Sequence, residues 1–208
     1  MSDVGAAGHV QPTVIEEALR TAVSAARGHF RYESGHHGDL WLDLDGLLVD
    51  ARPVRGWAVE LARRAAGCRP AIVCGPLTGG AFVAQLLAAE LAAGFVYAER
   101  LRSETGAVRY RIAQPLRAAV RGKRVLLADD AVNAGSALTA TLADLRECGA
   151  EPVGFASLLA LGDAAARMAQ QHGAPFFAVL SLARELWQPE HCPLCRAGVP
   201  LVDGLARP

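Results

Sequence analysis

The feature that most constrains how this 208-residue chain folds is a regular alternation of apolar runs with helix-like segments. Between the runs, apolar residues recur at helical spacing, for example over residues 135–150. Strands that alternate with helices form βα units, whose crossovers cover both faces of a parallel sheet. The pattern predicts an α/β fold with a doubly wound, mainly parallel five-stranded sheet, with strands at 71–75, 95–99, 124–129, 152–161 and 175–182.

The N-terminal part of the chain follows a different pattern. A helix is expected from Thr13, which can cap its start, to Gly28. Over residues 40–45, leucines alternate with Trp and Asp, which predicts a half-exposed strand in an antiparallel ribbon. A second helix is expected after Pro53. Residues 13–50 would therefore form a partial extra layer on the sheet.

Domain organisation and charge narrow the possible functions. Residues 1–12 are expected to be a flexible tail, and residues 13–208 a single domain. Lysine plus arginine (21) equals aspartate plus glutamate (21), so no basic field favours a nucleic acid partner. The apolar runs are far shorter than the ~20 residues that cross a bilayer, and no secretion signal is seen. An odd number of cysteines favours reduced thiols and a cytoplasmic location.

Two neighbouring acids, Asp129 and Asp130, stand at the end of an expected buried strand. Ligands of open parallel sheets bind outside the carboxyl ends of the strands. Residues 131–137 are nearly all small and lead into a helix, so their amides can approach a phosphate. Carboxylates repel phosphate but accept hydrogen bonds from hydroxyls, which makes a ribose 5-phosphate the expected ligand. The acids could instead merely end the strand and cap the helix, or belong to a receiver-like phospho-acceptor pocket.

The segment Val125–Ala137 resembles the phosphoribosyl-diphosphate-binding signature of the type I phosphoribosyltransferases. Asn133 stands where that family usually has threonine, and Ala134 is a variant similar to orotate phosphoribosyltransferases. The resemblance implies that Asp129 and Asp130 are catalytic. It also implies that the ribose phosphate is bound by Asp129, Asp130, Ala131, Val132, Asn133, Ala134, Gly135, Ser136 and Ala137.

Other segments agree with this resemblance. The glycine-rich turn after the first core strand occupies the place of the family's diphosphate-binding loop, and the next interval contains arginines where the family carries lysines and a histidine. The resemblance implies that diphosphate is bound by Thr78, Gly79, Gly80, Arg100 and Arg102. The segment around Phe30 resembles the hood over the base, formed mainly by residues 13–50 with the C-terminal segment 184–208.

Base recognition departs from the family pattern. The family places an Asp-Arg pair after the fourth strand, whereas Asp163 is followed here by Ala164, and Arg167 is the nearest arginine. Base binding is therefore assigned to Phe30, Asn133 and Arg167, and the identity of the base stays open.

Metal ligation by the protein alone is not expected. Cys192 and Cys195 form a CxxC, which is half a zinc site, and the second pair would have to come from another chain. Buried thiols in a turn are the preferred interpretation. His36, His37 and Asp39 lack a second histidine cluster in the sequence.

The resemblance implies an enzyme of pyrimidine nucleotide biosynthesis. It would convert phosphoribosyl diphosphate and a nucleobase, with orotate favoured, to a nucleoside 5'-monophosphate and diphosphate. Mg²⁺ is expected as cofactor through the substrate, with Asp129 and Asp130 as possible contacts, and a homodimer is expected. The alternatives are another base, or a regulatory protein on the same fold that senses phosphoribosyl diphosphate or a nucleotide.

Overall fold

The computed structural model describes residues 13–32, 35–44, 46–102 and 108–203. The expected tail at 1–12, the last residues of the C-terminal segment, Ser34 and Asp45 lie outside the described residues. Within the described part, no helix is long and apolar enough to cross a membrane.

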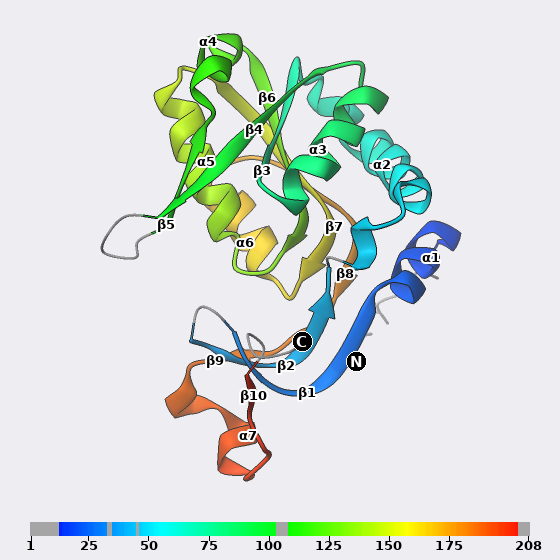
Figure 1. Ribbon diagram of the computed structural model, residues 1–208, viewed down its shortest axis with the longest axis vertical. Helices are drawn as coiled ribbons and strands as arrows, with labels where there is room; N and C mark the ends of the chain where they lie inside the picture. Colours follow the sequence, from blue (N-terminus) through cyan, green and yellow to red (C-terminus); the bar gives the residue numbers. More distant parts are fainter. Residues whose placement is uncertain (1–12, 33–34, 45, 103–107, 204–208) are drawn as a thin grey trace, which may run out of the picture.

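The main sheet has six strands in the order β5-β4-β3-β6-β7-β8 (Figure 1). Five of them pair in parallel, as predicted from the alternating pattern. The sixth, β5, adds to the edge of β4 in the antiparallel direction, within the interval that carries the arginines. The strands are β3 (Ile72–Pro76), β4 (Gly94–Arg102), β5 (Val108–Ile112), β6 (Arg124–Val132), β7 (Glu151–Leu161) and β8 (Phe176–Leu182).

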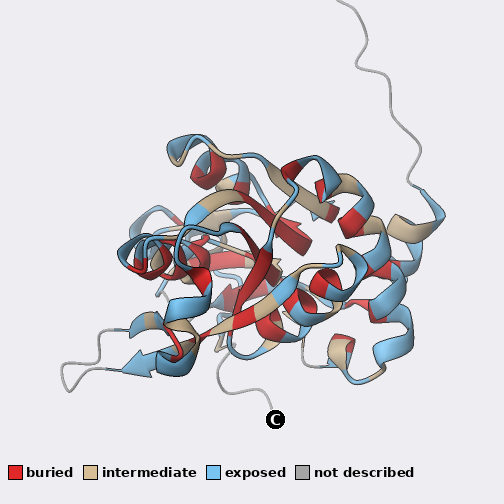
Figure 2. Cartoon of the chain, turned by 90° about the horizontal axis from the view of Figure 1, so that it is seen from above, coloured by how far each residue is buried: buried red, intermediate tan, exposed pale blue. Residues whose placement is uncertain are grey.

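Helices cover both faces of this sheet, so the doubly wound prediction is confirmed. On β6, Leu126 and Leu127 are both fully buried, and they enter two different apolar cores. Figure 2 shows buried residues along the strands and the inward sides of the helices. One face carries α1 (Val14–Ala22), α2 (Ala51–Ala65) and α3 (Gly79–Glu90), and the other carries α4 (Arg117–Val120), α5 (Ser136–Glu147) and α6 (Ala164–Gln171).

The first helix is shorter than its sequence pattern predicted. Thr13 caps it as expected, in a reciprocal pair of hydrogen bonds with Glu16. The helix ends at Ala22, and Ser24–Arg31 forms strand β1 instead of a continuation. The prediction of a helix to Gly28 is wrong because strand pairing with β2 (His37–Asp43) outweighs the helical spacing.

A second, four-stranded sheet has the order β10-β1-β2-β9. Its two central strands form the antiparallel ribbon that the sequence predicted. Its outer strands, β9 (Leu186–Trp187) and β10 (Val202–Asp203), come from the end of the chain, and α7 (Pro193–Arg196) lies between them in sequence. Figure 1 shows this sheet beyond the carboxyl ends of β6 and β7. The described residues also contain four short 3₁₀ helices: Gly46–Leu48, Ala66–Cys68, Gln114–Leu116 and Pro189–His191.

Candidate functional site

The acid pair lies near the carboxyl end of strand β6, which continues to Val132. Asp129 is buried and Asp130 is partly exposed. The Asp129 carboxylate accepts a hydrogen bond from the backbone N–H of Asp130 (3.1 Å), and the Asp130 carboxylate accepts one from the N–H of Ala131 (2.8 Å). These local bonds fix both side chains beside their own backbone.

The surroundings of the Asp129 carboxyl group change its pKa. Burial raises the pKa of Asp129 well above its ordinary value, and the neighbouring charge of Asp130 raises the same pKa further. A raised pKa means that the protonated form of Asp129 persists to higher pH than in a free carboxylic acid. At a pH below this raised pKa the pair carries less negative charge than two independent acids would.

The glycine-rich turn predicted to bind diphosphate lies directly against this acid pair. A Cβ built on Gly79 would come within 2.1 Å of the Asp130 Oδ2 atom, and a Cβ on Gly80 within 2.5 Å of Asp129 Oδ1. Gly79 and Gly80 form the first turn of α3, whose exposed N–H groups are suited to an anion. The structure thus brings together two motifs that are 50 residues apart in sequence.

The segment between β6 and α5 makes a tight turn at Gly135, which is the N-cap of the helix. Gly135 has a φ of +77°, and a Cβ there would come within 2.7 Å of the Met168 sulfur, so only glycine fits well. The helix begins at Ser136, and Thr139 donates its backbone N–H to the Gly135 carbonyl (2.9 Å). The turn therefore presents the first amides of α5 to the region beyond the sheet.

A cavity of about 600 Å³ opens next to this turn, between the two sheets. Of the predicted phosphate-binding residues, Asn133, Ala134 and Ser136 line it, and Arg100 contributes from β4. Asn133 is the informative residue here. Its Oδ1 atom is buried and has no hydrogen-bond partner among the described residues, which marks an acceptor suited to a ligand. The whole lining is Tyr32, His36, Trp41, Arg100, Val108, Tyr110, Asn133, Ala134, Ser136, Ala140 and Leu186.

Aromatic residues in the cavity wall were not singled out by the sequence analysis. Tyr32 and Trp41 stack with their rings nearly parallel, at a centroid distance of 6.3 Å. The guanidinium of Arg184 lies over the Tyr32 ring, 5.3 Å from its centroid. The alternating pattern of β2 could have identified Trp41, but only the pairing of β1 with β2 places Tyr32 beside it.

Other predicted site residues lie outside this cavity. Thr78 and Gly79 line a smaller cavity of about 170 Å³. Arg102 is exposed at the end of β4, and Phe30 is buried beside Trp41, with ring centroids 6.0 Å apart. Arg167, assigned to the base, forms an ion pair with Asp163 and is 60% exposed.

The arginine-bearing interval is partly structural. The ribbon of β4 and β5 is fixed at its base by Asp144, a buried residue of α5. The Asp144 carboxylate accepts hydrogen bonds from the Ile112 N–H (2.7 Å) and from Arg117 Nη1 (2.8 Å). Arg117 is therefore held by α5, and Arg100 lines the cavity.

Four potential metal ligands meet in the smaller sheet: His29, His37, Cys192 and Cys195. The CxxC thus receives its second pair from the same chain, not from another one. The expectation that no second pair exists within the chain is wrong because the histidines lie on adjacent strands, eight residues apart in sequence.

Comparison with known proteins identifies relatives. Residues 49–187 match the family model described as the phosphoribosyl transferase domain. The chain is 28% identical over 176 residues to an orotate phosphoribosyltransferase of Caldanaerobacter subterraneus, covering 85% of this chain and 87% of the relative. It is 27% identical over 196 residues to one of Wolinella succinogenes, covering 88% and 92%.

Solved structures share the fold. The orotate phosphoribosyltransferase of Aeropyrum pernix superposes with a TM-score of 0.64 at 24% identity, covering 81% of this chain and 94% of that one. The adenine phosphoribosyltransferase of Rhodothermus marinus gives a TM-score of 0.64 at 23% identity, covering 81% and 98%. At these identities the similarity establishes the architecture, and it does not distinguish between bases.

Proposed function

Because this chain belongs to the phosphoribosyltransferase family, we propose that it transfers the phosphoribosyl group of phosphoribosyl diphosphate to orotate. The observation that carries the proposal is that the Gly79–Gly80 turn lies against the acid pair at the end of β6, while the turn that follows β6 lines the large cavity with Asn133, Ala134 and Ser136. The curated relatives named above are orotate phosphoribosyltransferases, which favours orotate as the base.

The sugar-phosphate half of the substrate would lie across the end of β6. Amides of the turn at 133–137 would hold the 5'-phosphate, because the start of α5 presents N–H groups to an anion. The partly exposed Asp130 would accept hydrogen bonds from the ribose hydroxyls. As the bond to diphosphate breaks, positive charge develops on the sugar, and a nearby carboxylate stabilises it electrostatically.

The leaving diphosphate would lie at the start of α3. Thr78, Gly79 and Gly80 present the amides of the first helical turn, and Arg100 supplies a guanidinium from β4. Arginine holds phosphate without donating its proton, so its contribution is binding and charge neutralisation.

Mg²⁺ fits the acid pair as a cofactor bound mainly through substrate oxygens. The donors here are carboxylate oxygens, which suit this hard cation, and Asp130 is partly exposed whereas Asp129 is buried. When bound, Mg²⁺ would neutralise negative charge on the diphosphate. The cofactor, the homodimer and the cytoplasmic location remain predictions.

The base would lie in the cavity, against the rings of Tyr32 and Trp41. The carboxylate of orotate needs a cation or several donors when it leaves water. The guanidinium of Arg184 lies over the Tyr32 ring of the cavity wall, and its Nε and Nη1 atoms are buried without a hydrogen-bond partner among the described residues, so Arg184 can supply the cation. Arg167, to which base binding was assigned from the sequence, pairs with Asp163 instead, which makes a neutral base the second candidate.

Turnover assays with phosphoribosyl diphosphate and Mg²⁺ test the proposal against both alternatives. Orotate, uracil and the purine bases are supplied separately, and diphosphate release is measured. Orotate should give the highest kcat/KM. Turnover with another base alone would contradict the choice of orotate, and tight substrate binding without turnover of any base would support a regulatory protein instead.

The role of the acid pair is tested in the same assay with Asp130→Asn. This change keeps the shape of the side chain and removes its charge, so kcat should fall roughly 100-fold. Glu147→Gln, an exposed acid on α5, is the matched control and should leave kcat unchanged. Full activity of Asp130→Asn would contradict the role assigned to this carboxylate.

A further inference from the structure

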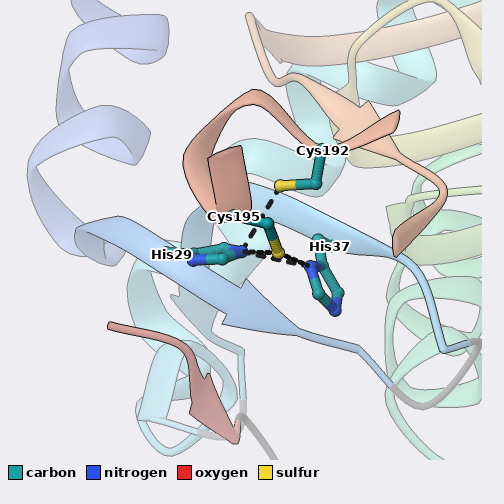
Figure 3. Close-up of side chains that lie close together, drawn as sticks. All are labelled: His29, His37, Cys192 and Cys195. Atoms are coloured by element: carbon teal, nitrogen blue, oxygen red, sulfur yellow. Dashed lines mark hydrogen bonds between the residues drawn. The ribbon is translucent and has the colours of Figure 1, made fainter. Parts of the chain in front are cut away.

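Two histidines of the smaller sheet lie close to two cysteines at α7, far in sequence from the acid pair (Figure 3). His29 lies on β1, His37 on β2, Cys192 just before α7, and Cys195 in α7. Their ligand atoms all lie within 4.8 Å of one another. His29, His37 and Cys192 are buried, and Cys195 is exposed.

The distances between these atoms match the edges of a zinc tetrahedron. The Nε2 atom of His29 is 3.1 Å from Nδ1 of His37, 3.4 Å from the Cys192 sulfur and 3.7 Å from the Cys195 sulfur. The Cys195 sulfur is 3.2 Å from Nδ1 of His37. With Zn–N near 2.0–2.1 Å and Zn–S near 2.3 Å, tetrahedral angles place nitrogens about 3.3 Å apart and nitrogen about 3.6 Å from sulfur.

The surroundings of His29 also suit a ligand. Its other ring nitrogen, Nδ1, lies 2.8 Å from the carbonyl oxygen of Val199. A histidine that donates Nδ1–H to a carbonyl has its lone pair on Nε2, the atom that faces the cysteines. The backbone of the C-terminal segment therefore orients a ring from the N-terminal strand.

We propose that His29, His37, Cys192 and Cys195 bind one Zn²⁺ ion in a structural site within a single chain. All four ligands come from the protein, which is the pattern of a closed structural site and leaves no position for substrate. The ion would take no part in the chemistry of the transferase reaction.

Hydrogen bonds without a metal are the competing explanation. Thiols are weak donors and weak acceptors, so two of them would compensate poorly for burying two imidazoles. A zinc ion instead satisfies all four groups at once, and its binding free energy is also folding free energy. Zinc binding would therefore stabilise the contact between the segments of His29 and Cys192, which are 163 residues apart in sequence.

The ion would fasten both outer strands to the central pair. His37 is paired with Trp187 of β9, and Phe30, which follows His29, is paired with Val202 of β10. Leu186, also on β9, lines the large cavity. Loss of the metal should therefore loosen the C-terminal segment and, through it, one wall of the cavity.

The first test measures zinc in the untagged wild-type chain. Protein produced with zinc in the medium and then dialysed should hold about one zinc per chain by elemental analysis. After zinc is removed with a chelator, added Co²⁺ should give an absorption spectrum with thiolate charge-transfer bands and tetrahedral d–d bands. Wild-type protein with reduced thiols that holds no zinc and gives no such cobalt spectrum would overturn the proposal.

Variants assign the ligands. Cys195→Ser and His37→Ala should each weaken zinc affinity by more than the roughly 10- to 100-fold that follows loss of a supporting partner. His191→Ala is the matched control, because this exposed histidine adjoins Cys192 and lies outside the cluster. Equal zinc affinity in Cys195→Ser, His37→Ala and the control would overturn the assignment, and the wild-type measurement decides if a variant fails to fold.

A structural readout separates this site from catalysis. Zinc removal should lower Tm and expose residues 186–203 to proteolysis in the absence of any substrate, and zinc should reverse both effects. Unchanged Tm and proteolysis on removal of bound zinc would overturn the structural role. None of these measurements depends on which base the enzyme uses.

Discussion

The carboxylate of Asp130 occupies the space that a side chain on Gly79 would need, with Oδ2 only 2.1 Å from an ideal Cβ position. The absence of a side chain at Gly79 therefore allows the acid pair and the start of α3 to share one surface. Close approach of this kind makes glycine necessary for a spatial reason, independent of backbone dihedral angles.

Gly79→Ala should lower kcat/KM by roughly tenfold or more, which corresponds to about 1.4 kcal/mol of transition-state binding. The new methyl group would displace the Asp130 carboxylate. Gly56→Ala is the matched control, since a Cβ there meets nothing within 4 Å in the middle of α2, and it should stabilise the helix by about 0.5–1 kcal/mol. Wild-type kinetics in Gly79→Ala would contradict this explanation.

Asp129→Asn should make the protein more stable at neutral pH. Because the pKa of Asp129 is raised in the folded state, the folded chain binds this proton more tightly than the unfolded chain does. Stability is therefore lost as pH rises from the ordinary pKa of 3.8 through the raised value. Asparagine has no proton to lose and can still accept the Asp130 N–H bond.

The measurement is Tm as a function of pH for both proteins. Asp129→Asn should exceed wild type by about 3 °C at pH 8, the order expected for 1 kcal/mol in a chain of this size. The difference should shrink as pH falls toward 3.8. A Tm difference that does not change with pH would refute the assignment of the raised pKa.

Asn133→Ala should weaken substrate binding and leave folding stability unchanged or slightly higher. The Oδ1 atom that this change removes is buried and unpartnered within the described residues, so its loss relieves a desolvation cost. Loss of one ligand hydrogen bond should raise KM roughly tenfold. Asn133→Thr, which supplies a hydroxyl oxygen as an acceptor, should lose less, and equal KM values for Asn133→Ala and wild type would contradict a ligand contact.

Asp144→Ala should destabilise the fold by about 2–3 kcal/mol, because it leaves the Ile112 N–H and Arg117 without their buried acceptor. For a chain of this size that corresponds to a fall in Tm of about 4–12 °C. The surface pair of Arg124 and Glu151 supplies the control, and Glu151→Ala should cost at most about 1 kcal/mol. Similar losses in the two variants, measured by urea unfolding, would count against the anchoring role of Asp144.

The parallel sheet could be predicted because its signal is local. Each strand of the core is a continuous apolar run, and such a run predicts a strand that is buried on both faces. The helix start at Ser136 follows from the small residues before it. The extent of α1 could not be predicted in the same way. Residues 24–27 include alanine and arginine, which favour a helix, yet pairing with β2 decided their structure.

The site shows the same division. The sequence motif predicted Asn133, Ala134 and Ser136 as phosphate-binding residues, and these residues line the cavity. It gave no sign that Asp130 touches Gly79, because that contact joins two separate βα units. The cluster of potential metal ligands was missed for the same reason: a CxxC and two histidines on a β-ribbon have no fixed spacing that links them.

The pairing of β1 with β10 joins residues that are 172 positions apart, at Arg31 and Asp203. During synthesis the parallel sheet can be complete while the first ribbon still lacks both of its outer strands. Leu186 belongs to one of these late strands and also lines the large cavity. Closure of the large cavity should therefore be among the last events of folding, so that a chain released early would have its core without a complete cavity wall.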